Sequence, residues 1–389
     1  MSPMSQWLSA FEADLDHLVG DLETLVRLES PTDEPIRVSE AARWVRDRLR
    51  ERGVAAEIRP CPPRGDAVLA SVALGEGGTL LLGHLDTVWP AGTLSRMPWR
   101  IDSGRACGPG VFDMKAGVVV GMAVLAAMAR SARPHPVSLL LVPDEEAGSG
   151  ASREETLLVA RRHRRVLVLE PSQDGAAKVA RKGCGTFRAR FQGRAAHAGL
   201  EPEKGASALA EMARFVSFLE DVAAPARGTT LTATLARAGS AANVVPEEAE
   251  LVVDARAWTH EEAERVTARI RAYQTSDARV VASVDGGLDR PPLEPTPASQ
   301  ALYEAARRLA FDLGFELGAA RVGGASDGNF TAAAGIPTLD GLGPRGGGAH
   351  SRDEHVLVAD LPVRAALLAA LVGEPLPGSF ARPPEGPSE

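Results

Sequence analysis

Three short apolar runs constrain the fold of this chain more than any other feature of its sequence. They cover residues 79–82, 137–142 and 166–169, and glycine, proline or charged residues bound each of them. Short apolar runs without alternation are typical of strands that are buried on both faces of a parallel sheet. Helical stretches lie between the runs, above all residues 115–130. The sequence therefore predicts an α/β domain with a mostly parallel sheet.

Polar residues with side chains suited to metal binding stand out, and most of them follow one of these runs. They are, in chain order, His84, Asp86, Asp113, Glu145, Glu146, Glu170 and His350. In an open parallel sheet, ligands bind in the crevice outside the carboxyl ends of the strands. We therefore expect the sheet to gather side chains that lie far apart in the sequence.

Each of these residues has an ordinary alternative role when it is taken alone. A histidine after a strand is more often a surface or core residue, and His350, after three glycines, would suit a flexible loop. The spacing of His84 and Asp86 favours a ligand, because residues two apart share a face and the carboxylate can accept the second ring N–H. The adjacent carboxylates Glu145 and Glu146 repel each other unless a cation or a shared proton is present. The complete set is typical of a two-metal hydrolase.

Length and composition permit two domains and exclude several kinds of partner. The 389 residues exceed one typical domain, and a hydrophobic content of 44% can bury a sizeable core. The net charge of −8 argues against nucleic acid or an anionic membrane as the main partner, because both attract basic surfaces.

The chain also has features that predict a cytoplasmic protein. Residues 1–18 are acidic and amphipathic, so we expect no secretory signal. We also expect no apolar segment that approaches the roughly 20 residues needed to span a bilayer. The three cysteines lack metal-binding spacing, and their odd number suits a reducing compartment.

The pattern of predicted elements changes near residue 185. From there the chain reads as strand, helix, two strands, helix and strand, which is the ferredoxin-like order β-α-β-β-α-β. A proline-rich segment at 286–297 marks the return, and His350 lies beyond it. We therefore expect a catalytic domain in two parts, residues 1–184 and 293–389, with an inserted α+β domain over residues 185–292.

Seven segments along the chain resemble those of the aminoacylase and carboxypeptidase family of co-catalytic zinc exopeptidases. They are GHLDTVWP, GPGVFDMKAG, PDEEAGS, LEPS, GRAAHAG, NVVPEEAELVVDAR and GAHSRDE. The resemblance covers nearly the whole chain in the right order. It is greatest for the glutamate carboxypeptidase (carboxypeptidase G type) branch.

The resemblance implies two Zn²⁺ ions per chain, with Co²⁺ or Mn²⁺ as substitutes. One ion would be bound by His84, Asp113 and Glu170. The other would be bound by Asp113, Glu146 and His350, so that Asp113 bridges the pair. A glutamate at position 170 is more typical of the carboxypeptidases and deacylases of this family than of its aminopeptidases.

The same resemblance implies the catalytic residues and a homodimer. Glu145 would be the general base, beside His84 and its partner Asp86. His197 in GRAAHAG would reach across a dimer formed by the inserted domain and polarise the scissile carbonyl in the partner's site. From the sequence alone, His197 is better explained as a surface histidine.

Substrate-binding residues also follow from the resemblance. Asn243 and Arg256 would hold the substrate, Lys178 and Arg290 match further cationic groups, and Ser326 in GGASDGN would line the pocket. Without the resemblance, Asn243 is an ordinary turn residue, Arg256 a strand-end cation and GGASDGN a glycine-rich turn. Several cations in an acidic protein favour a dianionic leaving group such as glutamate, because guanidinium binds carboxylate bidentately.

The resemblance, together with these residues, implies hydrolysis of an amide bond that releases a C-terminal amino acid. We expect glutamate to be released from N-acyl, peptidyl or folate-like substrates that carry a free carboxylate. An N-acyl amino acid deacylase, of the acetylornithine deacetylase or aminoacylase type, would use the same metal core with a different pocket. A non-catalytic metal-binding dimer would be marked by loss of Glu145 or of a ligand, and the sequence retains them all.

Overall fold

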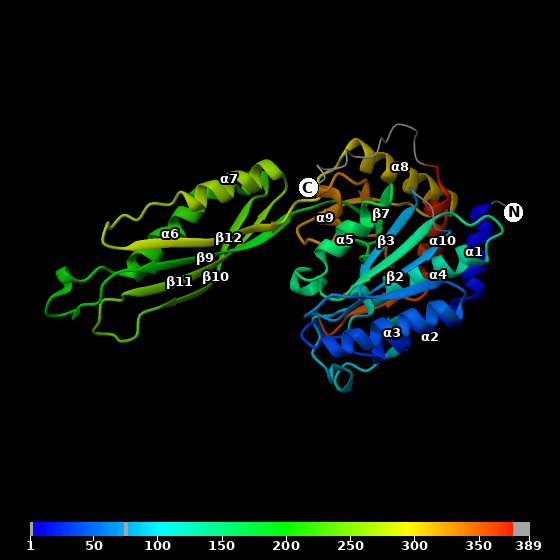
Figure 1. Cartoon of the computed structure of the whole chain (residues 1–389), viewed down its shortest axis with the longest axis horizontal. Coiled ribbons are helices and arrows are strands. Elements are labelled where there is room, and N and C mark those ends of the chain that lie inside the picture. The colour runs from blue at the N-terminus through cyan, green and yellow to red at the C-terminus, as the bar shows by residue number, and fades with distance from the viewer. Residues whose placement is uncertain (1–2, 74–76, 376–389) are drawn as a thin grey trace. The chain divides into compact units, whose positions relative to one another are not determined.

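A computed structural model describes residues 3–73 and 77–375, which form two compact units (Figure 1). The first unit comprises Met1–Val179, Pro295–Arg321 and Ser326–Glu389. The second comprises Ala180–Glu294 and Val322–Ala325, whereas the boundaries expected from the sequence were residues 185 and 292. Each unit is described by itself below.

A six-stranded sheet in the order β1-β2-β6-β3-β7-β14 forms the centre of the first unit (Figure 1). The four neighbouring strands β6, β3, β7 and β14 run parallel, β2 pairs antiparallel with β6, and β1 pairs antiparallel with β2. The strands are β1 (Ala55–Pro60), β2 (Asp66–Val72), β3 (Thr79–His84), β6 (Val137–Val142), β7 (Arg165–Val168) and β14 (Thr338–Leu339). The predicted α/β class with a mostly parallel sheet is therefore confirmed.

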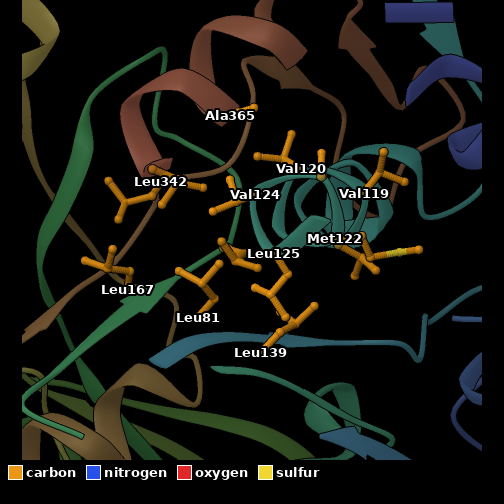
Figure 2. Packing of buried hydrophobic residues seen from close by; sticks show 14 of the residues in the cluster. Leu81, Val119, Val120, Met122, Val124, Leu125, Leu139, Leu167, Leu342 and Ala365 are labelled. Atoms are coloured by element: carbon orange, nitrogen blue, oxygen red, sulfur yellow. The ribbon is translucent and has the colours of Figure 1, made fainter. Parts of the chain in front are cut away.

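Helices cover both faces of this sheet because its central strands are apolar on both sides. Alternate residues Leu81, Leu139 and Leu167 belong to the core beneath α4 and α10, whereas Leu80 and Leu140 belong to the opposite core. Figure 2 shows the first of these cores, with strand leucines directed towards α4. The helices of this unit are α1 (Pro3–Ala13), α2 (Leu15–Arg27), α3 (Pro35–Glu51), α4 (Ala116–Arg130), α5 (Arg153–Ala160), α8 (Pro297–Asp312), α9 (Gly328–Ala333) and α10 (Asp360–Gly373).

Helix α4 corrects one expectation from the sequence. Together with the preceding turn it forms a segment, Val111–Arg130, that is long and apolar enough to cross a membrane, with a mean hydropathy of 1.8. The expectation that no segment approaches this length was therefore wrong. The physical reason is burial inside the protein, because 89% of the apolar stretch within this segment is buried. The helix packs on the sheet and against α2 and α10. A helix surrounded in this way is apolar all round.

Two small sheets complete the first unit. One has the order β15-β16-β5-β4, and its strand β5 ends shortly before the turn that carries Asp113. The other pairs β13 with β8, which continues into the second unit. Their strands are β4 (Arg100–Asp102), β5 (Arg105–Cys107), β8 (Ala177–Arg181), β13 (Ala319–Val322), β15 (Gly346–Gly347) and β16 (His355–Leu357).

The second unit is an antiparallel sheet in the order β10-β11-β9-β12, with two helices on one face (Figure 1). Its strands alternate: Phe187, Ala189 and Phe191 are buried against the helices, and Arg188 and Arg190 lie on the other face. The elements follow the expected β-α-β-β-α-β order. They are β9 (Gly183–Gln192), α6 (Ala208–Val222), β10 (Thr230–Ala238), β11 (Glu248–Ala257), α7 (His260–Arg271) and β12 (Val281–Arg290).

Candidate metal centre

The first unit gathers the predicted ligands at the carboxyl ends of neighbouring strands. His84 ends β3, the Glu145–Ala147 turn follows β6, and Glu170 follows β7. These three strands are adjacent in the sheet, with β3 between β6 and β7. Asp113 lies in the turn Val111–Lys115 that leads into α4. The sheet order thus converts residues far apart in sequence into one cluster.

Asp113 lies between the two histidines. Its Oδ1 is 3.2 Å from Nε2 of His84, and its Oδ2 is 3.4 Å from Nε2 of His350. Nε2 of His84 also lies 3.5 Å from Oε1 of Glu170, and Nε2 of His350 lies 3.2 Å from Oε1 of Glu146. Each imidazole therefore faces one oxygen of Asp113 and one further carboxylate.

Two overlapping groups of ligand atoms have the compactness that a metal ion requires. The atoms of His84, Asp113 and Glu146 lie within 4.8 Å of one another, and so do those of His84, Glu145 and Glu170. Glu145, for which the resemblance implied a role in proton transfer, thus lies among the predicted ligands. Glu145 and Glu146 are both only partly exposed.

Asp86 contacts three residues of this cluster, His84, Glu145 and Glu146. It is 1% exposed, and Nδ1 of His84 lies 3.0 Å from its backbone oxygen and 3.3 Å from Oδ1. Its two carboxylate oxygens accept the backbone N–H groups of Glu145 and Glu146, each at 3.1 Å. With Nδ1–H of His84 directed at Asp86, the lone pair of Nε2 is free to bind a metal.

The electrostatics of the cluster reflect an excess of negative charge. Burial alone would lower the pKa of His84, but hydrogen bonds to Asp113, Asp86 and Glu170 raise it well above its ordinary value. Hydrogen bonds to Asp113 and Glu146 raise the pKa of His350 to about 10. Burial raises the pKa of Glu146, with a further contribution from Asp113. The carboxylates therefore need positive charge, which a divalent cation supplies when it replaces these protons.

His350 reaches the cluster from a strained backbone. Its φ is 61°, in the left-handed region that a residue with a side chain adopts only at a cost. The side chain is half exposed, unlike that of His84. A backbone held in this conformation directs the imidazole towards Asp113 and Glu146.

The sequence pattern gives no role to Glu354, although the structure places its carboxylate against the backbone of the turn that carries Asp113. Its carboxylate is 1% exposed and accepts hydrogen bonds from the backbone of the turn that carries Asp113. The one available signal is its position in GAHSRDE, shortly after His350.

Two of the predicted substrate-binding residues belong to the first unit. Lys178 lies in β8 and is 9% exposed. Ser326 is fully buried, and its hydroxyl donates to Asp340 while accepting the backbone N–H of Gly328. Ser326 would therefore have to exchange its bond to Asp340 before its hydroxyl contacted a substrate.

The other four predicted residues, His197, Asn243, Arg256 and Arg290, belong to the second unit. His197 and Asn243 are exposed and lie side by side, since Ala198 donates to the backbone oxygen of Asn243. Arg256 donates to Asp254 and to the backbone oxygen of Gly323. Arg290 is 6% exposed and lies opposite Cys184 on the neighbouring strand β9.

The environment of His197 selects one tautomer. Its Nδ1 accepts the backbone N–H groups of Gly199 and Leu200, at 3.1 and 3.2 Å. A neutral imidazole that accepts at Nδ1 carries its proton at Nε2. The exposed edge of His197 is therefore a hydrogen-bond donor.

Curated relatives match this chain over different lengths. Carboxypeptidase G2 from Pseudomonas sp. (strain RS-16) is 30% identical over 377 residues, which cover 93% of this chain and 91% of that protein. Acetylornithine deacetylase from Proteus mirabilis (strain HI4320) is 31% identical over 176 residues, which cover 44% of this chain and 45% of that protein.

Solved structures share the fold at lower identity. Aminopeptidase PepT from Bacillus cereus ATCC 10987 matches with a TM-score of 0.77 and 22% identity, over 92% of this chain and 98% of that one. The YXEP protein of Bacillus subtilis, described as a dinuclear metal binding peptidase from the M20 family, matches with a TM-score of 0.66 and 16% identity, over 93% and 98%.

A family model decides the classification. The model of peptidase family M20/M25/M40 matches residues 80–374, which include the predicted ligands from His84 to His350. The same residues carry the geometry described above, and the relative matched over 93% of the chain is a carboxypeptidase by name. The resemblance predicted from the sequence is confirmed: the chain belongs to peptidase family M20/M25/M40 and is an enzyme of the peptidase type.

Proposed function

We propose that this enzyme holds two zinc ions and hydrolyses an amide bond to release a C-terminal amino acid, with glutamate as the preferred product. The observation that carries the proposal is the position of Asp113, whose two oxygens face the Nε2 atoms of two different histidines. A carboxylate in this position is suited to bridge two cations. The name of the relative carboxypeptidase G2 supports the carboxypeptidase reaction.

The donor set fits two divalent cations of the zinc type. His84 and Glu170 would complete one site with Asp113, and His350 and Glu146 would complete the other. Imidazole nitrogen and carboxylate oxygen are ordinary zinc ligands, and cobalt or manganese would be accepted by the same set. When bound, the ions would acidify a water molecule and polarise the substrate carbonyl.

Glu145 is placed to move the proton during the reaction. Its carboxylate lies beside the ligand atoms of His84 and Glu170, and Asp86 holds its backbone N–H at 3.1 Å. In the proposed mechanism Glu145 accepts a proton from the attacking water and then donates it to the leaving nitrogen. No covalent intermediate is required.

His197 is proposed to stabilise the oxyanion. Its Nδ1 is occupied by two backbone donors, so its Nε2–H is the group that it can offer to a substrate. We propose that it acts in the partner's site of a homodimer formed through the second unit. Support comes from its exposure and its location outside the unit that holds the metal cluster.

Substrate specificity is proposed to depend on the basic residues Lys178, Arg256 and Arg290, together with Asn243. A carboxylate of the leaving amino acid would be bound by the Arg256 guanidinium in competition with Asp254, which it already contacts at 3.0 and 3.2 Å. Such charge-assisted contacts are typically bidentate with arginine. Glutamate, with two carboxylates, would use more of these cations than amino acids with a single carboxylate.

A second candidate is the removal of an N-acyl group from an amino acid, as in acetylornithine deacetylase. The observation in its favour is the 31% identity to that enzyme over 176 residues. The same metal ligands and Glu145 would perform this reaction, and the difference would lie in how the acyl and amino acid parts are bound.

The test is a substrate panel with the zinc-loaded enzyme. Acyl-glutamates, folate-like compounds, short peptides and N-acetylornithine would be compared, each acyl-glutamate also with its carboxylate blocked. We expect the free acyl-glutamates to give the highest kcat/KM. The Arg256→Ala variant should lose roughly tenfold to a hundredfold on them, as a charge-assisted contact of ~1.5–3 kcal/mol implies, and little on blocked substrates.

Two outcomes would count against the proposal. A preference for N-acetylornithine over every acyl-glutamate would favour the deacetylase. An equal loss in the Arg256→Ala variant on free and blocked substrates would remove the carboxylate anchor.

A further inference from the structure

Glu354 accepts four hydrogen bonds from the segments that carry the predicted metal ligands, and the proposed reaction gives it no role. It lies immediately before β16, and its Oε1 accepts the backbone N–H groups of Phe112 and Asp113 at 2.9 and 3.0 Å. Its Oε2 accepts the backbone N–H of Gly110 at 2.9 Å and Nε1–H of Trp89 at 2.7 Å. Four donors, two on each oxygen, therefore converge on one buried carboxylate.

This arrangement requires a carboxylate and no other group. Both oxygens of Glu354 act only as acceptors, and a buried charge of this kind is tolerated because N–H donors replace its lost water. An amide of the same size would turn its NH₂ group towards two N–H donors. Glutamine at this position would therefore break two hydrogen bonds and add a repulsion in place of each.

Three segments that carry predicted ligands meet at Glu354. Three of its donors belong to the turn Gly110–Asp113, and the backbone N–H of Asp113 itself is one of them. Trp89 belongs to the loop that follows His84 and Asp86. Glu354 itself follows His350 on the third segment.

We propose that Glu354 is the positioning residue of the bridging carboxylate, holding the Asp113 turn at the distance from His350 that two adjacent ions require. The inference rests on the proposed two-metal function and deepens it. Ligand sets of this kind need their geometry held to within about 0.5 Å. Loss of a residue that orients a ligand typically lowers metal affinity by about 10–100-fold.

Two of these segments, the one that carries Glu354 and the one that leads into the Asp113 turn, are also joined without Glu354, so its removal is compatible with folding. Strand β16 pairs with β5 through His355 and Cys107, Val356 and Ala106, and Leu357 and Arg105. Val356 and Ala106 are both fully buried. The small sheet therefore keeps β16 beside β5, whereas the orientation of the Asp113 turn depends on the carboxylate.

The experiment compares Glu354→Gln with the wild-type chain. Zinc affinity is measured by competition with a chromophoric chelator, and the cobalt-loaded protein is examined by absorption spectroscopy. We expect a folded protein whose affinity for at least one ion is 10–100-fold weaker, with a changed cobalt spectrum. A folded variant with wild-type affinity for both ions and an unchanged spectrum would overturn the proposal.

Trp89→Phe is the graded variant. It removes one donor from Oε2 and leaves the backbone N–H of Gly110 in place, so the loss of zinc affinity should be several-fold and smaller than in Glu354→Gln. If Glu354→Gln does not fold, Trp89→Phe decides the matter: weaker zinc binding supports the positioning role, and unchanged binding refutes it.

Glu211→Gln is the matched control. Glu211 is a buried carboxylate of the second unit that accepts the Tyr273 hydroxyl and the backbone N–H of Ser276, at 2.6 and 2.8 Å. Its substitution should lower stability and leave zinc affinity unchanged. A wild-type chain that binds fewer than two ions would contradict the proposed function itself, whereas the role of Glu354 is judged only by the difference between variant and wild type.

Discussion

Buried carboxylates occur in both units of this protein, but the charge of the carboxylates in the metal cluster is compensated differently from that of Glu262 in the second unit. In the second unit, Glu262 accepts hydrogen bonds from Arg227, Arg265 and the hydroxyl of Thr229. Hydrogen bonds from Arg265 above all lower the pKa of Glu262 to about 2. In the first unit, burial raises the pKa of Glu146, whose nearest basic group is His350.

The difference lies in the kind of base that each carboxylate meets. Arginine is charged at every accessible pH, so Arg227 and Arg265 already compensate the negative charge of Glu262. Histidine is charged only while it holds a proton, and the carboxylates around Asp113 raise the pKa values of His84 and His350 so that this proton is favoured. A metal cation can replace those protons, which gives the cluster a second source of positive charge. The comparison separates a carboxylate that stabilises the fold by pairing with arginine from carboxylates that are suited to bind a metal.

The largest effect expected within the metal cluster separates Glu145 from Glu146. Glu145→Gln should retain both ions and lower kcat by on the order of a hundredfold to ten-thousandfold, because only proton transfer is removed. Glu146→Gln should instead lose metal. Metal content by atomic spectroscopy and single-turnover rates would be measured for both variants, and identical behaviour of the two would break the assignment of roles.

The contribution of the second unit is tested by mixing two inactive variants. In the proposed homodimer, the His197→Ala and Glu145→Gln proteins should each be nearly inactive, whereas a heterodimer of the two would contain one site assembled from two intact halves. After random exchange, about a quarter of wild-type activity should return if each site draws on both subunits of a symmetric dimer. Lack of recovery, with exchange confirmed by mass spectrometry, would contradict the shared site.

A smaller effect concerns the pH dependence of stability through Glu262. Its folded pKa of about 2 lies below the value of about 4.3 expected for an unfolded chain. The ionised form therefore stabilises the fold above pH ~4.3, and this contribution, about 1–3 kcal/mol, is lost as the pH falls towards 2.

Glu262→Gln should remove that dependence. Calorimetric unfolding at pH 7, 4 and 3 should show a less stable variant at pH 7 and a shallower decline than in the wild type. Parallel declines for both proteins would show that Glu262 does not carry the effect. The Glu262→Gln variant should keep the zinc affinity of the wild type, which distinguishes this carboxylate from those near Asp113.

Much of the fold could be predicted because it depends on local pattern. The apolar runs before His84, Glu145 and Glu170 indicated parallel strands, and parallel strands bring their carboxyl ends together. The alternation in 187–192 similarly indicated a sheet with one covered face. Each of these patterns lies within a short stretch of consecutive residues, so the strands could be predicted without knowing which distant residues they contact.

Other features depend on contacts that no local pattern contains. Glu354 accepts hydrogen bonds from donors on residues 110–113, and its position after His350 in GAHSRDE does not indicate which donors it meets. Helix α4 has the hydropathy of a membrane segment because it is enclosed by the sheet and other helices. The burial of Ser326 and its bond to Asp340 likewise follow from packing.

The number of ions bound per chain tests the central claim most directly. Metal-free protein would be titrated with zinc by calorimetry and the bound metal counted by atomic spectroscopy, with Asp113→Asn alongside. We predict two zinc ions for the wild type and a marked loss of at least one of them in Asp113→Asn, because that substitution removes the carboxylate shared by both histidines. Saturation of the wild type at a single ion, or two tightly bound ions in Asp113→Asn, would contradict the account.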